Sequence, residues 1–94
     1  NARGWVMATY QNGQQIRYTI DSLASVGGHA TVAKGDTGIY LGPANAAKGD
    51  TGIYLGPAND PDSKWYLTSY TYLDDDLNWC TAIVPVTEAM IEPA

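Results

Sequence analysis

The sequence predicts a small all-β domain whose short strands form a barrel. Turn signals recur about every eight to twelve residues, and the stretches between them are rich in β-branched and aromatic residues. No stretch has the length and periodicity of a long helix, and the 10 glycines favour turns. Many short strands at this spacing are typical of small barrels. The 94 residues suffice for one domain, residues 1–94.

The first elements predicted are two strands joined by a tight turn. Residues 5–10 read WVMATY, and Asn12-Gly13 follows them as a strong hairpin signal, because both residues tolerate positive φ. Residues 15–20 alternate in polarity, which indicates a half-buried strand with three side chains on its inner face: Ile16, Tyr18 and Ile20. We therefore expect a hairpin between 5–10 and 15–20.

Residues 21–28, DSLASVGG, have two interpretations. Asp21 or Ser22 could cap one helical turn that ends at Gly27. The same residues could also form a long irregular loop.

A tandem repeat occupies the middle of the chain, at residues 33–46 and 47–60. The copies differ only at their last position, Ala46 against Asp60. Two short copies are too few for a solenoid, so we interpret the repeat as one element written twice. Each copy predicts a Lys-Gly-Asp-Thr-Gly turn, then an Ile-Tyr-Leu strand that Gly-Pro ends.

Only one copy can occupy a given strand of the barrel. The other still carries Ile, Tyr and Leu, whose exposure to water is unfavourable. We expect it to pair with its twin as a hairpin, or with another molecule by strand swapping or edge pairing. The repeat residues assigned to such an interface are Gly35, Asp36, Gly38, Tyr40, Gly49, Asp50, Gly52 and Tyr54.

The C-terminal third predicts two more strands. Residues 64–73 are rich in Trp, Tyr and Thr with no cleanly polar face, which indicates a central strand. A charged turn at 73–78 leads to a strand at 79–86, broken at Pro85. Residues 87–91 predict one helical turn with Thr87 at its cap, and 92–94 should fray.

The order of these elements resembles the SH3-like barrel superfamily. The matching parts are the Gly35–Gly38 turn (or Gly49–Gly52), Trp65-Tyr66 opening a strand, the Asp74–Asp76 turn, and Pro85 before Glu88-Ala89-Met90. The resemblance implies a five-stranded barrel.

Two members of that superfamily differ from this chain in the residues that bind their ligands. Peptide-binding SH3 domains carry an Ala-Leu-Tyr-Asp-Tyr-like segment, where residues 6–10 read VMATY, and a tyrosine about where Ala89 stands. Plasmid-type dihydrofolate reductase uses Val-Gln-Ile-Tyr, whereas residues 81–84 read TAIV. We therefore expect neither polyproline recognition nor reductase activity.

Charge and composition exclude several classes of partner. The net charge is −5, and the five basic residues are scattered, so neither nucleic acid nor an anionic membrane is expected to bind. Cys80 is the single cysteine, which excludes an intrachain disulfide. With no signal peptide recognised, a cytoplasmic location is favoured.

Sequence patterns for catalysis and metal binding are weak. His29 and Cys80 could form a nucleophilic pair, but Cys80 lies in an apolar segment and is expected to pack as a small hydrophobe. The acids at 74–76 lack the spacing of a calcium loop and predict a solvated turn. Lys34-Gly35-Asp36 predicts a turn in which the Asp side chain bonds nearby backbone. No catalytic residue, metal or cofactor is expected.

The aromatic residues carry the functional prediction. With no Phe, the seven Tyr and three Trp either form the core or leave an amphipathic surface of the kind that interfaces use. The expected binding residues are Tyr10, Trp65, Tyr66, Tyr70, Tyr72 and Trp79. We expect a non-enzymatic module that contacts protein, either another copy or a different chain. The alternative is an oligomeric barrel with a small-molecule or catalytic pocket between subunits. The duplication could also mark a variant of a parent domain.

Overall fold

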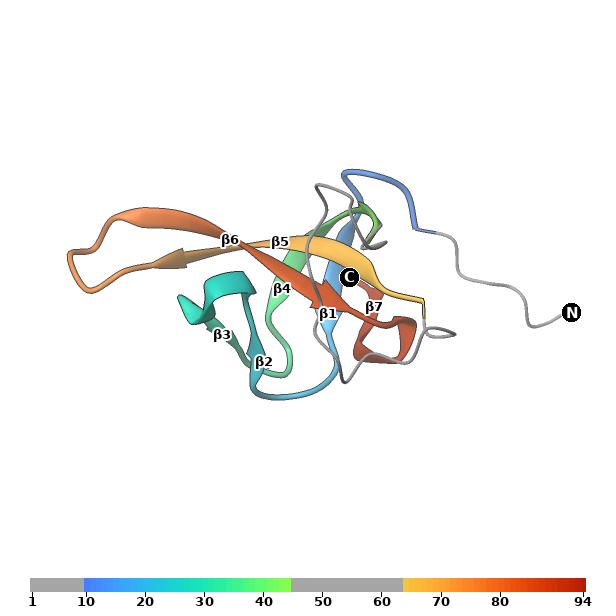
Figure 1. The fold of residues 1–94 in the computed structure, drawn as a ribbon, viewed down its shortest axis with the longest axis horizontal. Coiled ribbons are helices and arrows are strands. Elements are labelled where there is room, and N and C mark those ends of the chain that lie inside the picture. Colours follow the sequence, from blue (N-terminus) through green and yellow to red (C-terminus); the bar gives the residue numbers. More distant parts are fainter. Residues whose placement is uncertain (1–9, 45–63) are drawn as a thin grey trace, which may run out of the picture.

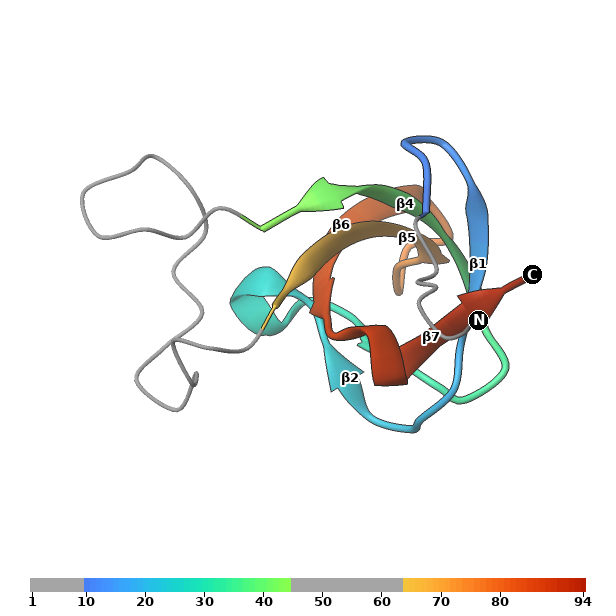
Figure 2. The same cartoon turned by 90° about the vertical axis from the view of Figure 1, so that its right-hand side faces the viewer.

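The computed structural model describes residues 10–44 and 64–94, and they form an all-β fold. A five-stranded antiparallel sheet has the order β6-β5-β4-β1-β7, and β2 and β3 form a separate two-stranded sheet (Figure 1). The large sheet curls around the core (Figure 2). Its strands are β1 (Gln15–Tyr18), β4 (Thr37–Pro43), β5 (Tyr66–Leu73), β6 (Trp79–Val86) and β7 (Ile91–Pro93).

Strand β1 lies between β4 and β7, and this corrects the predicted N-terminal hairpin. Ile16 is opposite Gly38 on one side and Pro93 on the other. Both edges of β1 are thus occupied, so the hairpin with residues 5–10 is wrong; of that segment only Tyr10 lies among the described residues. The turn itself forms, with Gly13 at φ 91° and its N–H donating to the Tyr40 carbonyl (2.8 Å).

The excursion between β1 and β4 differs from both interpretations of residues 21–28, because it contains a short strand and a 3-10 turn with Ser25 at its N-cap. Strand β2 (Leu23–Ala24) precedes a 3-10 turn, η1 (Val26–Gly28), and β3 (Thr31–Val32) returns beside β2. Asp21 caps no helix; its carboxylate accepts the Lys34 N–H (2.8 Å). Ile20, expected on the inner face, is 39% exposed, because β1 ends two residues earlier at Tyr18.

The first copy of the repeat supplies β4, and the second copy lies outside the described residues. The predicted turn is confirmed: Asp36 accepts the Ala33 N–H through Oδ2 (3.1 Å), and Gly35 has φ 95°. The strand runs past the expected stop, because a bulge between Tyr40 and Gly42 lets pairing continue to Pro43.

The chain from β5 to β7 largely follows the prediction, but Pro85 does not break β6, which runs from Trp79 to Val86. Strand β5 is central, between β4 and β6, and the β5–β6 ladder pairs without interruption from Tyr66 opposite Val86 to Leu73 opposite Trp79. A single 3-10 turn follows, η2 (Glu88–Met90). The expected fraying of 92–94 is wrong, because β7 pairs with β1 and the Ala94 N–H donates to the Gln15 carbonyl (3.3 Å).

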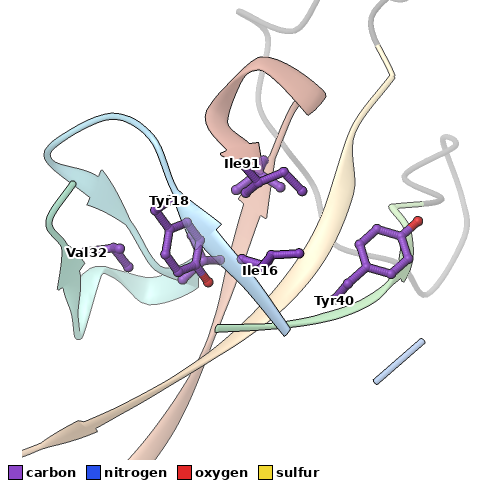
Figure 3. Close-up of a cluster of buried hydrophobic side chains, with 7 residues drawn as sticks. Ile16, Tyr18, Val32, Tyr40 and Ile91 are labelled. Atoms are coloured by element: carbon purple, nitrogen blue, oxygen red, sulfur yellow. The ribbon is translucent and has the colours of Figure 1, made fainter. Parts of the chain in front are cut away.

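The core lies against the inner faces of β1, β4, β6 and β7 and includes Val32 of β3 (Figure 3). Its buried side chains are Ile16, Tyr18, Val32, Tyr40, Val84, Val86 and Ile91. Tyr18 is 1% exposed, and its hydroxyl bonds Thr68 Oγ1 (2.7 Å), which donates to the Val84 carbonyl (2.8 Å). Among residues 10–44 and 64–94, no helix has the length and apolarity needed to cross a membrane.

Candidate functional site

The structure divides the six expected aromatic binding residues among three places. Tyr10, Trp65 and Tyr66 lie near the β4–β5 end of the sheet; Tyr70 and Tyr72 line a cavity; Trp79 stands at the outer end of the β5–β6 hairpin. They therefore do not form one surface. Three different roles follow from the contacts of each group.

The first group forms a row of tyrosine rings, Tyr10, Tyr40 and Tyr66, which we call the core-end tyrosines. Ring centroids are 5.5 Å apart for Tyr10 and Tyr40, and 5.8 Å for Tyr40 and Tyr66. Burial, and then the Glu88 carboxylate, raise the pKa of each of the three hydroxyls. Because Tyr40 is buried and the other two pack against the core, this group is chiefly structural.

Beside this row, Trp65 has a polar group that the described structure leaves unsatisfied. Its indole Nε1 is buried and has no hydrogen-bond partner among residues 10–44 and 64–94. Its carbonyl accepts the Ala44 N–H (2.8 Å), which ties together the two ends of the segment between β4 and β5. Trp65 therefore has a clear backbone role.

The second group, Tyr70 and Tyr72, lines a cavity of about 560 Å³. One wall comes from the residues after η1, the other from the outer part of the β5–β6 hairpin. Together these are His29, Ala30, Thr31, Tyr70, Tyr72, Leu73, Asp74, Asp75 and Cys80. The volume falls within the usual range for small-molecule sites.

Contacts behind the cavity fix the Tyr70 ring. Its hydroxyl donates to Asp36 Oδ2 (2.7 Å), and its ring meets Tyr18 edge-on at 6.1 Å between centroids. The rings of Tyr70 and Tyr72 lie nearly parallel, 11° apart, with centroids separated by 6.3 Å. Burial, and then the hydrogen bond to Asp36, raise the pKa of Tyr70 to about 12, so the phenol is neutral at ordinary pH.

Asp74 gives the cavity a fixed negative charge. Its Oδ1 accepts the backbone N–H groups of Asn78 and Asp76, each at 2.9 Å. These bonds, the Asn78 bond first, lower the pKa of Asp74, so it stays ionised. The charged turn predicted for 73–78 is thereby confirmed from Asp74 onward, whereas Leu73 is the last residue of β5.

Cys80 stands beside this carboxylate as a thiol. Its Sγ lies 3.6 Å from Asp74 Oδ2, and burial and that carboxylate raise the Cys80 pKa. Although His29 lines the same cavity, a thiol whose proton is held this way is a poor nucleophile.

The third place is the hairpin tip, residues 73–79, which exposes large apolar side chains. Leu77 is 76% exposed, Trp79 is 71% and Leu73 is 47%. Leu77 has φ 64°, a left-handed conformation that is costly for a side chain of this size. An exposed tryptophan beside two exposed leucines is an arrangement that protein interfaces use.

Strand β6 is also an edge strand, and η1 packs against part of it. It is the outermost strand of its sheet, and β5 is its one strand partner among the described residues. None of its residues, WCTAIVPV, is charged. Edge strands that must not pair normally carry charges or proline, and here Pro85 protects only the inner end.

The residues assigned to the repeat have structural roles wherever the structure describes them. Besides the Gly35-Asp36 turn, Gly38 packs against the protein interior: a Cβ there would lie 2.6 Å from the Ser69 carbonyl oxygen and would also collide with the Tyr18 hydroxyl. Tyr40 is in the core. The four second-copy residues lie outside the described residues: Gly49, Asp50, Gly52 and Tyr54.

Sequence reasoning missed the exposed leucines and the cavity. Leu73 and Leu77 flank a charged turn, and the sequence carries no signal for their exposure. The cavity joins residues about 29–31 and 70–80, which only the fold brings together. Within the described ranges, no group of three or more His, Cys, Asp or Glu side chains could hold a metal ion. No protein-family model, curated protein or solved structure matches the chain.

Proposed function

We propose that the chain is a non-enzymatic SH3-like barrel that works by protein contact and assembles with a second copy of itself through β6 and the hairpin tip. The observation that carries the proposal is the hairpin tip, where Trp79 and Leu77 are each more than two-thirds exposed at the end of an uncharged edge strand. Burying these apolar side chains against a partner removes them from water, which stabilises the complex.

The barrel part of the proposal rests on topology. The sheet order β6-β5-β4-β1-β7, the long excursion between β1 and β4, the tight β5–β6 hairpin and the 3-10 turn before β7 are the features expected of an SH3-like barrel. No ladder joins β6 to β7 among the described strands, so the sheet has two edges.

The second copy is favoured as partner because of the chemistry of the edge. An uncharged strand pairs with an identical antiparallel strand without burying a charge, and two-fold pairing brings two copies of the same patch together. The side chain of Trp79 then adds the large buried area that interfaces require.

Light scattering across a concentration series tests this proposal. The wild-type molar mass should rise with concentration toward twice the monomer value. Thr81→Lys, which puts a charge on the exposed edge, and Trp79→Ser should each hold the mass near that of a monomer. Thr71→Lys is the matched control, because Thr71 is opposite Thr81 and is also exposed, but on interior strand β5. A wild-type monomer at every concentration would refute self-assembly.

A further inference from the structure

The cavity beneath the hairpin has features that the contact function does not use. It is lined by two tyrosines, two aspartates and a histidine, and its walls come from segments far apart in sequence. No lysine or arginine is among the described residues that line it. Any ligand must therefore suit an acidic, aromatic and partly open cavity.

The ring of Tyr70 is held in place before a ligand arrives. Tyr70 is fixed by its hydrogen bond to Asp36 and by the edge of Tyr18. Tyr72 lies almost parallel to it on the same face of β5, since the two residues are two positions apart along the strand. Aromatic rings attract cations through the negative charge of their faces, and preorganised rings bind with a smaller loss of entropy.

The carboxylate of Asp74 is held equally firmly. Two backbone N–H groups bond Oδ1, while Oδ2 lies near the Cys80 thiol. Asp75 adds a second acidic side chain to the lining. A neutral aromatic ligand would gain nothing from these charges, and an anion would be repelled.

We propose that this cavity binds a small organic cation of the alkylammonium class, with the charged head group against Tyr70 and Tyr72 and near Asp74. Methylated ammonium groups fit best, because they carry charge on an apolar surface and lose little hydration when they leave water. The same head group occurs in free choline and in a trimethyllysine side chain. The cavity adjoins the self-association surface, because Cys80 of β6 and residues 73–75 of the hairpin tip line it.

Amide chemical shifts measured by NMR during titration test the proposal. Choline chloride should shift the signals of residues 29–31 and 70–75 saturably. Its neutral isostere 3,3-dimethylbutan-1-ol, at the same concentrations and with ionic strength matched by sodium chloride, should not. Light scattering on the same samples separates ligand binding from any change in association. Equal shifts with the isostere, or no saturable shift with choline, would overturn the proposal.

Variants then identify the contacts. Tyr72→Leu should weaken choline binding roughly three- to thirty-fold, whereas Tyr72→Phe, which keeps the ring face, should bind as the wild type does. Asp74→Asn keeps an oxygen for the turn but removes the charge, and it should also weaken binding. Thr71 lies between the two tyrosines in the strand but on the opposite, exposed face, so Thr71→Ala should not change choline binding. If Phe and Leu at 72 weaken binding equally, the rings do not hold the cation.

A peptide with one trimethyllysine, compared with the same peptide containing unmodified lysine, distinguishes the two sources of the head group. Tighter binding of the methylated peptide than of choline would indicate a protein side chain as the ligand. Weaker binding would indicate a free small molecule. Either result requires loss of binding in Tyr72→Leu, and binding that persists in that variant would contradict the site.

Discussion

The inner and outer halves of the β5–β6 hairpin share one uninterrupted ladder but differ in burial. In the inner half, Thr68, Val84 and Val86 are fully buried, whereas in the outer half Leu73 and Trp79 are exposed. Backbone hydrogen bonds therefore carry the hairpin past the core, to a part where the side chains of Leu73 and Trp79 are exposed. The difference teaches that the inner half is built for stability and the outer half is available for binding.

The largest effect should come from filling the space at Gly38, where β4 lies against the inner hairpin. Gly38→Ala places a Cβ against the Ser69 carbonyl, which is backbone and cannot move aside easily. We expect the free energy of unfolding to fall by about 3 kcal/mol in urea denaturation. Thr37→Ala, at the exposed neighbouring position, should change it by less than about 0.5 kcal/mol. Equal effects would show that β4 is not packed as described.

Within β5, the two halves can be compared by the same substitution. Thr68→Val removes the acceptor for the buried Tyr18 hydroxyl and the donor to the Val84 carbonyl. Unfolding should become easier by about 2 kcal/mol, since buried polar groups are left unpaired. Thr71→Val, on the exposed face, should stay within about 0.5 kcal/mol of wild type. A destabilised Thr71→Val would mean that the outer half also supports the core.

Tyr70 stands between the halves, and alkaline pH should reveal its contacts. Its pKa is about 12 in the folded protein, above the ordinary value of 10.0, so the folded state holds the proton more tightly. Stability is therefore fully present below pH 10 and decreases as pH rises toward 12. Tyr70→Phe should make this decrease shallower in denaturation measured from pH 9 to 11.5. An unchanged slope would show that the other tyrosines with raised pKa account for it.

Deleting residues 47–60 should affect neither half strongly. The first copy already supplies β4, and a shorter connection between β4 and β5 lowers the entropy cost of closing it by about 1 kcal/mol. The midpoint temperature of thermal unfolding should thus be unchanged or slightly higher. Deleting residues 33–46 instead gives a chain that differs from the 47–60 deletion product at one position, where Asp60 stands in place of Ala46. If either deletion unfolds the protein, the second copy has a structural role.

The sequence identified much of the fold and less of the candidate site. Alternation at Ile16 and Tyr18, the Lys-Gly-Asp turn and the aromatic β5 predicted their elements, because each depends on local chemistry. The N-terminal hairpin was wrong because β4 and β7 pair with β1 from distant parts of the chain.

The site was harder to predict for the same reason. Tyr40, assigned to a repeat interface, is buried in the core, whereas Trp79, assigned to binding because it is aromatic, is exposed. The cavity depends on the approach of residues 29–31 to the hairpin, which no local pattern encodes.

The most direct test of the division between the two halves is Leu77→Gly, measured for both stability and association. Glycine relieves the left-handed backbone at φ 64° and removes an exposed apolar side chain from the tip. Urea denaturation should show an increase of about 1 kcal/mol in stability, while light scattering should show weaker self-association. If the variant is less stable, or if its association equals that of wild type, the hairpin tip is not a binding surface carried at the expense of stability.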